Sequence, residues 1–344
     1  MRRIAVGLSI VVALAVAALG AGVWQVHRFM ATELPVPENG IQFEIANGSS
    51  FSTVSQQLVE KGVIQSDRLL RLHARWSGDA SNVQAGDYLI MPGATPSSLL
   101  QQFTSGAVRL YSFTIIEGWN NRDLLAALHA ADAVQASMTD EDWPGLLSDL
   151  GANVVHPEGL FLPETYRFPR NTTDRELLAQ AYTLMQTGLE EEWRARDEAA
   201  PVKTPYDALI LASIVEKETA RADERQRIAG VFARRLQKRM RLQTDPTVIY
   251  GLGPQFNGNL TRRDLRTDTP YNTYTRHGLP PTPIAMPGRA AIHAALNPAP
   301  GKALFFVATG LGDGSHAFSE TKAEHDAAVA EYLRRLRQQR KQGG

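Results

Sequence analysis

TPYDALILASIVEKETARADERQRIAGVFARRLQKRMRLQTDPTVIYGLG, residues 204–253, is the segment around which the remainder of the chain is organised. Its first residues carry a helix-start signal. Thr204 can cap a helix, Pro205 suits the first helical position, and Asp207 completes a short-armed capping box. The apolar run that follows, Ala208–Val215, predicts a helix that is buried on most sides.

Two carboxylates end that buried run, Glu216 and Glu218. Burial penalises an ionised carboxylate, so such a group keeps its proton to higher pH, as general-acid catalysis requires. Positions two apart on a helix, at about 100° per residue, point to nearly opposite sides, so the two glutamates are not expected to form one paired site. Spacing leaves open which one faces a cleft and which one faces solvent or a basic partner. A buried helix that simply emerges into solvent is the alternative interpretation.

Three long strings, LASIVEKETA, RLQTDPTVIYGLG and TPYNTYTRHGLPPTPIAMPG, resemble the endolytic murein transglycosylases of the MltG (YceG-like) family. The resemblance covers nearly the whole chain, as a short N-terminal anchor, a LysM-like module and a catalytic domain. It implies that the second glutamate of the E-K-E triplet, Glu218, is the catalytic acid.

The composition is that of an ordinary globular protein of about two domains, with 344 residues, 43% of them hydrophobic and 21% charged. Equal numbers of acidic and basic residues give no electrostatic case for binding nucleic acid. The absence of cysteine excludes disulfides, thiolate nucleophiles and Cys-ligated zinc. His293, His316 and His325 form no H-E-x-x-H pattern, and no G-x-S-x-G or Walker motif is present, so we expect neither a metal nor a cofactor.

The N-terminus predicts a membrane anchor. Residues 4–26 are apolar apart from two polar side chains, which is long enough to cross a bilayer core of about 30 Å. Arg2 and Arg3 precede this run, so residues 1–3 are expected to be cytoplasmic and the catalytic domain to face the periplasm from the inner membrane. A signal peptide cleaved near the small residues of ALGAG is the alternative.

The chain after the anchor predicts an α+β fold in two units. Residues 27–40 suit a linker, and residues 41–106 follow a β-α-α-β order, with strands in IQFEIANG and QAGDYLIMPG. This order resembles a LysM module, a fold that binds glycans in other proteins, although a packing or spacing domain is equally open. Residues 107–340 form the predicted catalytic domain.

Residues 158–174, EGLFLPETYRFPRNTTD, combine aromatic rings and prolines with two acids, as suits the wall of a sugar cleft. The family resemblance implies that this loop lies close to the catalytic helix. Glu158 and Glu164 are therefore candidate site residues, with helix caps or surface ion pairs as the alternative roles.

Two further segments, RLQTDPTVIYG and TPYNTYT, are expected to be loops whose amides, hydroxyls and rings recognise polysaccharide. Their candidate substrate-binding residues are Gln243, Thr244, Asp245, Tyr250, Tyr271, Asn272 and Tyr274. GLPPTPIAMPG is too rich in proline for a helix or a central strand and is expected to form a rigid wall of the cleft, or otherwise a polyproline ligand. The basic residues of the helix expected over residues 221–241 suit a solvated face or cell-wall peptide carboxylates.

The resemblance implies cleavage of peptidoglycan glycan strands at the β-1,4 bond between N-acetylmuramic acid and N-acetylglucosamine, leaving 1,6-anhydro ends. It also implies association with the synthetic machinery, such as penicillin-binding proteins, and termination of growing strands. One alternative is a lysozyme-like hydrolase that uses Asp245 or Glu164 as a second carboxylate. The other alternative is a non-catalytic scaffold that holds glycan strands.

Overall fold

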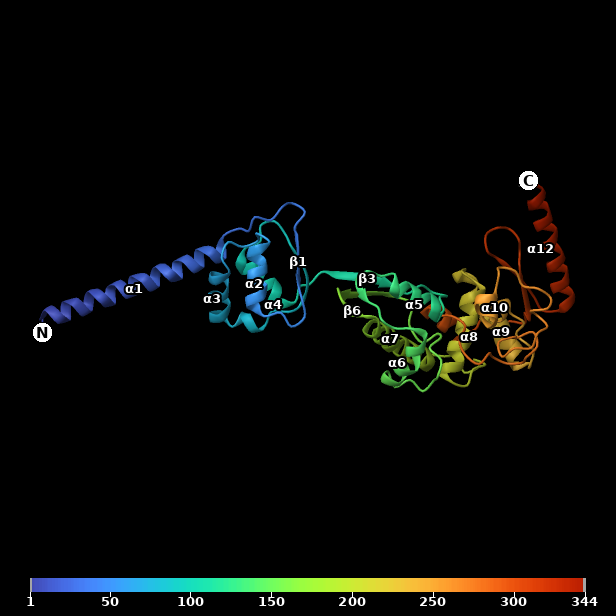
Figure 1. Ribbon diagram of the computed structural model, residues 1–344. Coiled ribbons are helices and arrows are strands. Elements are labelled where there is room, and N and C mark those ends of the chain that lie inside the picture. The colour runs from blue at the N-terminus through green and yellow to red at the C-terminus, as the bar shows by residue number, and fades with distance from the viewer. Residues whose placement is uncertain (1, 343–344) are drawn as a thin grey trace. The chain divides into compact units, whose positions relative to one another are not determined.

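The computed structural model describes residues 2–342, which form two compact units (Figure 1). The first unit runs through Tyr111 and includes Arg167–Asn171. The second contains Ser112–Tyr166 and the chain from Thr172 onward. Both mix helices with strands, so the predicted α+β fold class is confirmed at that level. The domain ranges proposed from the sequence stay predictions.

The first unit is a two-stranded sheet covered by helices. Its elements are α1 (Arg2–Ala31), β1 (Ile41–Ile45), α2 (Phe51–Glu60), α3 (Asp67–Ser77), the 3-10 turn Asp79–Ser81, β2 (Gly86–Ile90) and α4 (Pro96–Ser105). β1 and β2 pair antiparallel, with Ile41 opposite Ile90 and Ile45 opposite Gly86. The β-α-α-β order is therefore confirmed, whereas the likeness to a LysM module stays a prediction.

The core of the first unit follows from the alternation of apolar residues in its strands. Phe43 and Ile45 of β1 are buried, while Glu44 between them faces outward. The ring of Phe103 stacks 5.8 Å from Phe43 and meets the edge of Tyr88 at 4.7 Å. Tyr88 stays polar at its tip, where its hydroxyl donates to the carbonyl of Gln84 at 2.7 Å.

Helix α1 fits the predicted membrane anchor. Its segment Ile10–Ala31 is long and apolar enough to cross a bilayer, with a mean hydropathy of 1.9. The helix continues past residue 26 to Ala31, because Met30 packs into the core of the first unit together with Leu34. Residues 27–31 therefore belong to α1, and the linker proposed over residues 27–40 stays a prediction. The predicted cytoplasmic segment, residues 1–3, begins outside the described residues.

The second unit is mainly helical, with short strand pairs at its edges. Its helices are α5 (Asn121–His129), α6 (Trp143–Asp149), α7 (Asp174–Arg194), α8 (Pro205–Glu218), α9 (Ala222–Gln237), α10 (Asp245–Leu252), α11 (Arg289–Leu296) and α12 (Lys322–Gln342). The 3-10 turns Asp140–Asp142 and Gly253–Gln255 complete its helical elements. The strand pairs are β3 (Leu110–Thr114) with β5 (Thr165–Pro169), β4 (Val134–Gln135) with β6 (Thr172–Thr173), and β7 (Phe305–Ala308) with β8 (His316–Ser319).

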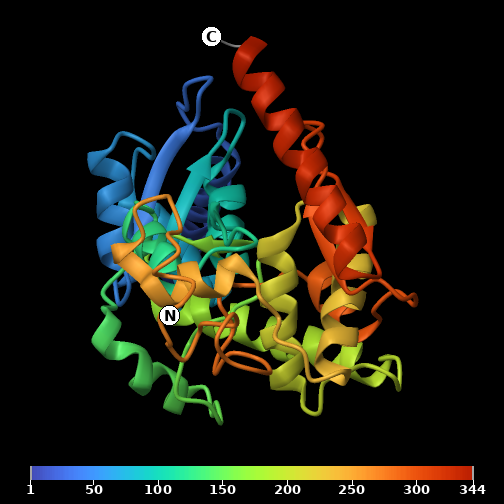
Figure 2. The same cartoon turned by 90° about the vertical axis from the view of Figure 1, so that its right-hand side faces the viewer.

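Helix α8 is the centre of this unit. Residues Ala208–Val215 are all buried, and the helix packs against α7, α9, α10 and α11. The predicted capping box is present, since Thr204 Oγ1 accepts the N–H of Asp207 at 3.0 Å and Asp207 accepts that of Thr204 at 3.1 Å. Figure 2 shows α12 (red) rising at one edge, beside the hairpin of β7 and β8 that it contacts.

Some elements differ from the sequence prediction. Residues 245–252 form α10 and not a loop, because Asp245 and Pro246 provide a helix start. Strand β5 lies inside the predicted loop 158–174, where the alternation of buried Tyr166 and Phe168 with exposed neighbours carries the strand signal. The predictions also did not include α6, α11 or β8.

Candidate active site

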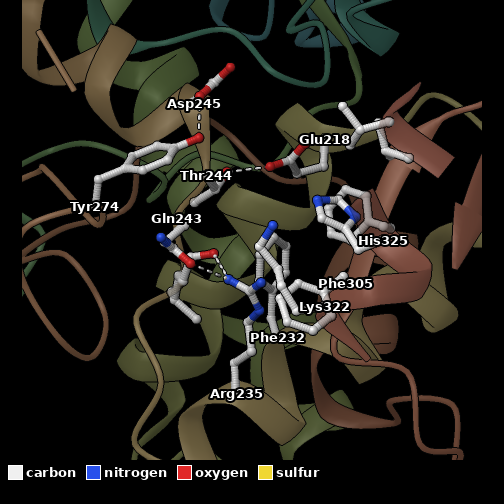
Figure 3. A pocket seen from close by; sticks show the side chains of 14 residues that line it. Glu218, Phe232, Arg235, Gln243, Thr244, Asp245, Tyr274, Phe305, Lys322 and His325 are labelled. Carbon is white, nitrogen blue, oxygen red and sulfur yellow. Dashed lines mark hydrogen bonds between the residues drawn. The ribbon is translucent and has the colours of Figure 1, made fainter. Parts of the chain in front are cut away.

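Glu218 is the last residue of α8, where the chain leaves the core and Thr219 turns to an extended conformation. A pocket of about 410 Å³ opens beside its side chain (Figure 3). Helices α9, α10 and α12, the segment that ends at Thr244, and strand β7 contribute the other walls. A helix with a fully buried central run, Ala208–Val215, therefore delivers a carboxyl group to an open pocket.

A hydroxyl group faces this carboxyl group directly. Thr244 Oγ1 donates a hydrogen bond to Glu218 Oε1, as the dashed line in Figure 3 marks. Thr244 is itself buried and fixed, because its N–H donates to Thr273 Oγ1 at 3.1 Å. Thr247 adds a contact of 2.9 Å between its hydroxyl and that of Thr273. Buried threonines thus place the donor opposite Glu218.

Burial raises the pKa of Glu218 to about 7, and the charge of nearby Asp245 acts in the same direction. The hydrogen bond from Thr244 lowers the pKa but does not outweigh burial. A substantial fraction of Glu218 is therefore protonated at neutral pH. A protonated carboxyl group in an open pocket can donate a proton, and its conjugate base can accept one.

Arg235 holds the segment that carries Thr244. Its guanidinium donates to the carbonyls of Leu242 at 2.8 Å and Leu304 at 2.7 Å, and it lies 5.0 Å from the ring of Phe305. The same group donates to Gln243 Oε1 at 3.3 Å. Gln243 has a left-handed backbone with φ 53°, so the turn before Thr244 is a strained one that Arg235 stabilises.

Asp245 and Tyr274 form the opposite rim of the pocket. The hydroxyl of Tyr274 donates to Asp245 Oδ1 at 2.6 Å. Burial raises the pKa of Tyr274, so the phenol stays neutral and remains a donor. Asp245 is exposed and is a second carboxylate on the pocket wall.

Glu216 points away from this pocket, which confirms the divergence expected from the helical spacing. Its carboxylate accepts the N–H of Gly288 at 3.0 Å and lies 3.6 Å from a guanidinium nitrogen of Arg225. Burial is the main cause that raises the pKa of Glu216. Glu216 therefore faces a basic partner and the proline-rich loop.

Glu158 belongs to a different buried cluster. It accepts the N–H of Asn121 at 3.1 Å and the hydroxyl of Tyr250 at 2.9 Å, and burial raises its pKa to about 7. The ring of Tyr271 lies 4.9 Å from that of Tyr250, and its hydroxyl lies 2.9 Å from Thr282 Oγ1. Glu158, Tyr250 and Tyr271 thus join α5, α10 and the proline-rich loop, and none of them lines the pocket at Glu218.

Two other predicted site residues also lie outside the pocket. Glu164 is exposed and accepts the N–H of adjacent Thr165 at 3.0 Å. Asn272 is buried, where its amide donates to the carbonyl of Thr267 at 2.7 Å and accepts the N–H of Tyr274 at 2.9 Å. Asn272 therefore shapes the loop that presents Tyr274. The pocket brings together Glu218, Gln243, Thr244, Asp245 and Tyr274.

The pocket also contains side chains that sequence reasoning did not propose. His325 stacks on Phe305 at 5.2 Å, and its buried Nδ1 has no hydrogen-bond partner among the residues described. Burial lowers the pKa of His325, which favours the neutral imidazole. Lys322 lies one turn away on α12. α12 begins at Lys322, far from Glu218 along the sequence, and gives no sequence signal of its closeness to that residue. Only the fold could identify these groups.

The described residues contain no group of three or more His, Cys, Asp or Glu side chains that could hold a metal ion. The site is instead a pocket with one carboxyl group of raised pKa, flanked by hydroxyls, rings and cationic side chains. This arrangement defines a class of protein, one equipped for acid–base chemistry on a polar substrate.

The chain matches a protein-family model, curated relatives and a solved structure. The model of the YceG-like family matches residues 43–331, and the chain belongs to this family. It is 32% identical over 310 residues to the endolytic murein transglycosylase of Bacillus subtilis, covering 85% of each protein. It is 26% identical to that of Streptococcus pneumoniae, over 92% of this chain and 63% of the relative. The crystal structure of a YceG-like protein from Listeria monocytogenes matches with a TM-score of 0.55 and 29% identity, over 85% of this chain and 99% of that one.

Proposed function

We propose that this protein is an endolytic murein transglycosylase, a lyase that cuts the glycan strands of peptidoglycan. Membership of the YceG-like family and relatives of that name support the assignment. The observation that carries it is Glu218, a carboxyl group with a pKa near 7 at the wall of an open pocket. Such a group can act first as an acid and then as a base at neutral pH.

The proposed reaction cleaves the β-1,4 bond between N-acetylmuramic acid and N-acetylglucosamine. Protonated Glu218 gives its proton to the glycosidic oxygen as the bond from that oxygen to C1 breaks. The resulting carboxylate takes the proton of the C6 hydroxyl of the same muramic acid as O6 bonds to C1. No water is consumed, and the new end is a 1,6-anhydro sugar. One carboxyl group serves both steps because the nucleophile is tethered to the substrate.

Thr244 has a defined role in this scheme. Its hydroxyl hydrogen bond stabilises the ionised form of Glu218, which is the form present between the two proton transfers. Burial alone would make that ionised state costly. The balance of the two effects leaves the pKa near the pH at which the group must both give and take a proton.

The remaining walls suit a sugar chain. The rings of Phe305 and Tyr274 offer faces and edges on which pyranose rings can pack, and the Gln243 amide can bond hydroxyl or acetamido groups. His325 adds an imidazole ring to the pocket wall. Lys322, which pairs with Asp326 on α12, adds a cation that suits the carboxylate-bearing peptides of peptidoglycan.

One observation favours a second candidate, hydrolysis by a lysozyme-like mechanism. Asp245 lines the same pocket as Glu218 and could activate a water molecule as a second carboxylate. Its hydrogen bond from Tyr274 holds it in place at 2.6 Å. Glu164, the other second carboxylate considered, does not line the pocket.

The proposed setting is the inner membrane. α1 would anchor the chain, with the catalytic domain in the periplasm, where the substrate is found. Cutting within strands near their site of synthesis would terminate nascent chains, and it would bring the enzyme close to penicillin-binding proteins.

Digestion of purified sacculi tests the function. Sacculi are incubated with the full chain in detergent, with Glu218→Gln, and with Glu216→Gln as the matched control. We expect soluble fragments of many lengths from the wild type and from Glu216→Gln, and none from a folded Glu218→Gln. Glycan binding without fragments from any of the three proteins would instead support the scaffold alternative.

A further inference from the structure

Helix α3 displays an apolar face beside the membrane anchor. Leu72 and Trp76 lie one helical turn apart on that face, and 59% and 79% of their surfaces are exposed. Single exposed apolar residues are common and carry no argument. Here, however, both side chains line a groove of about 790 Å³ between α3 and α1, which belong to the same unit.

The groove continues onto the part of α1 that is suited to lipid. From α1 its lining includes Leu19, Val23 and Val26, and from α3 it includes Leu69, Leu72 and Trp76. Leu19 and Val23 belong to the candidate membrane span Ile10–Ala31. An apolar groove that joins a membrane span is continuous with the bilayer surface once the span is inserted.

Depth along α1 supports contact with lipid. Trp24 and Arg28, with the guanidinium 5.4 Å from the ring, are of the types that mark the boundary between water and lipid. At about 1.5 Å per residue, Leu19 lies roughly 8 Å deeper along α1 than Trp24. An interfacial helix buries its apolar face about 5–10 Å into this region, which agrees with the reach of the groove.

Charges on α3 complement an anionic surface. Arg68 and Arg75 are exposed, and with Arg71 they line a second pocket of about 540 Å³ that Ser52 of α2 also lines. Arg71 already has partners within the protein, because it forms an ion pair with Asp67 at 2.8 Å and donates a hydrogen bond to Ser52 Oγ at 2.8 Å. Exposed arginines next to an apolar face suit lipid phosphates, because guanidinium groups form charge-assisted bonds to them.

We propose that the first unit docks on the membrane surface through α3, with Leu72 and Trp76 at the acyl boundary and Arg68 and Arg75 on anionic headgroups. The proposal rests on the membrane anchor of the proposed function. The occupant is lipid and not glycan, because most residues that line the groove are apolar and the groove joins the span of α1. Docking would give the unit a fixed orientation on the bilayer, which a single helix cannot impose by itself.

The chain contains no cysteine, so single labels can be introduced without background. Leu72→Cys, Trp76→Cys, Leu19→Cys and Asn47→Cys are made in the full chain and labelled with an environment-sensitive fluorophore. Each is reconstituted into phosphatidylcholine vesicles with and without phosphatidylglycerol. Asn47 is the matched control, since it is exposed and follows β1, which lies on the side of the unit away from α1 (Figure 1).

We expect labels at residues 19, 72 and 76 to emit at shorter wavelength in vesicles and to be quenched by lipid-borne nitroxides, while the label at residue 47 is unaffected. Arg68→Gln with Arg75→Gln should reduce quenching at residues 72 and 76 in anionic vesicles and leave residue 19 unchanged. Quenching at residue 19 alone would overturn the docking and leave the anchor standing. No quenching at residues 19, 72 and 76 would overturn both the docking and the membrane anchor. A response of the label at residue 76 to soluble glycan chains, but not to lipid, would assign this face of α3 to glycan.

Discussion

The hydroxyl of Thr244 donates a hydrogen bond to the carboxylate of Glu218, and it comes from the segment that leads into α10. This contact joins two parts of the sequence that are 26 residues apart. It opposes the effect of burial on the pKa of Glu218 without cancelling it. The pKa of Glu218, the acid of the proposed mechanism, is therefore set by burial and by this hydrogen bond, which act in opposite directions and which mutation can separate.

The first prediction concerns pH. Because the mechanism begins with protonated Glu218, kcat/KM should fall about tenfold per pH unit above a pH near 7. Thr244→Val removes the bond that favours the ionised form, so the pKa should rise and the alkaline limb should move up by roughly one pH unit. The measurement is fragment release from sacculi between pH 5 and 9. A limb that stays in place, or moves down, would contradict this role of Thr244.

The second prediction concerns stability. In the unfolded chain Glu218 loses its proton near pH 4.5, whereas in the folded protein it keeps it to about pH 7. Wild-type stability should therefore fall as pH rises between these values. Glu218→Gln has no such cost, so it should be more stable than the wild type at pH 8 by on the order of 1–3 kcal/mol, with the difference vanishing below about pH 4.5. Thermal unfolding of the wild type and of Glu218→Gln, at pH 8 and below about pH 4.5, tests this prediction. Equal melting temperatures of the two proteins at pH 8 would argue against a raised pKa of Glu218.

How much of this could be predicted from sequence depends on where each residue's partner lies along the chain. The capped helix that ends at Glu218 could be predicted, because its cap, apolar run and acidic end are local. The opposite directions of Glu216 and Glu218 follow from helical spacing alone. Thr244, Asp245 and Tyr274 were identified as candidates by their chemistry, and the fold then placed them in one pocket.

Long-range packing separates other candidate residues from the pocket at Glu218. Tyr250 and Glu158 have chemistry that suits sugar binding, but they bond each other at 2.9 Å in a buried cluster away from the pocket. His325 offered no local motif, since its partners in the pocket come from α8, α9 and β7. Composition identifies groups that can do chemistry, whereas long-range packing decides which of them meet.

The third prediction concerns the contact between Gly159 and the proline-rich segment GLPPTPIAMPG. Gly159 has φ 78°, and a Cβ there would lie 2.5 Å from Pro283 of the proline-rich segment. Gly159→Ala should therefore lose on the order of 2–4 kcal/mol, from the left-handed backbone and from the clash. Gly151→Ala is the control, because φ there is 66° and no atom lies within 4 Å of the added Cβ. Denaturant unfolding of both variants measures the loss of unfolding free energy. Equal losses would mean that Pro283 shifts to accommodate the added Cβ at little cost.

The fourth prediction concerns His325. Its imidazole lines the pocket at Glu218 and is a candidate substrate contact, so His325→Leu should lower kcat/KM about 2- to 10-fold, mostly through KM. His293→Leu is the control, since His293 pairs with Glu192 on the surface at 2.8 Å. The two variants are compared by initial rates on soluble glycan strands. Wild-type kinetics for His325→Leu would remove it from the site.

Mass spectrometry of the newly formed strand ends, with digestion carried out in heavy-oxygen water, tests the central claim most directly. Transglycosylation by Glu218 predicts anhydro-muramyl ends that are one water lighter than reducing ends and carry no heavy oxygen, with none formed by Glu218→Gln. Reducing ends that carry the heavy isotope would contradict the account, and would assign the chemistry to hydrolysis with Asp245 as the second carboxylate.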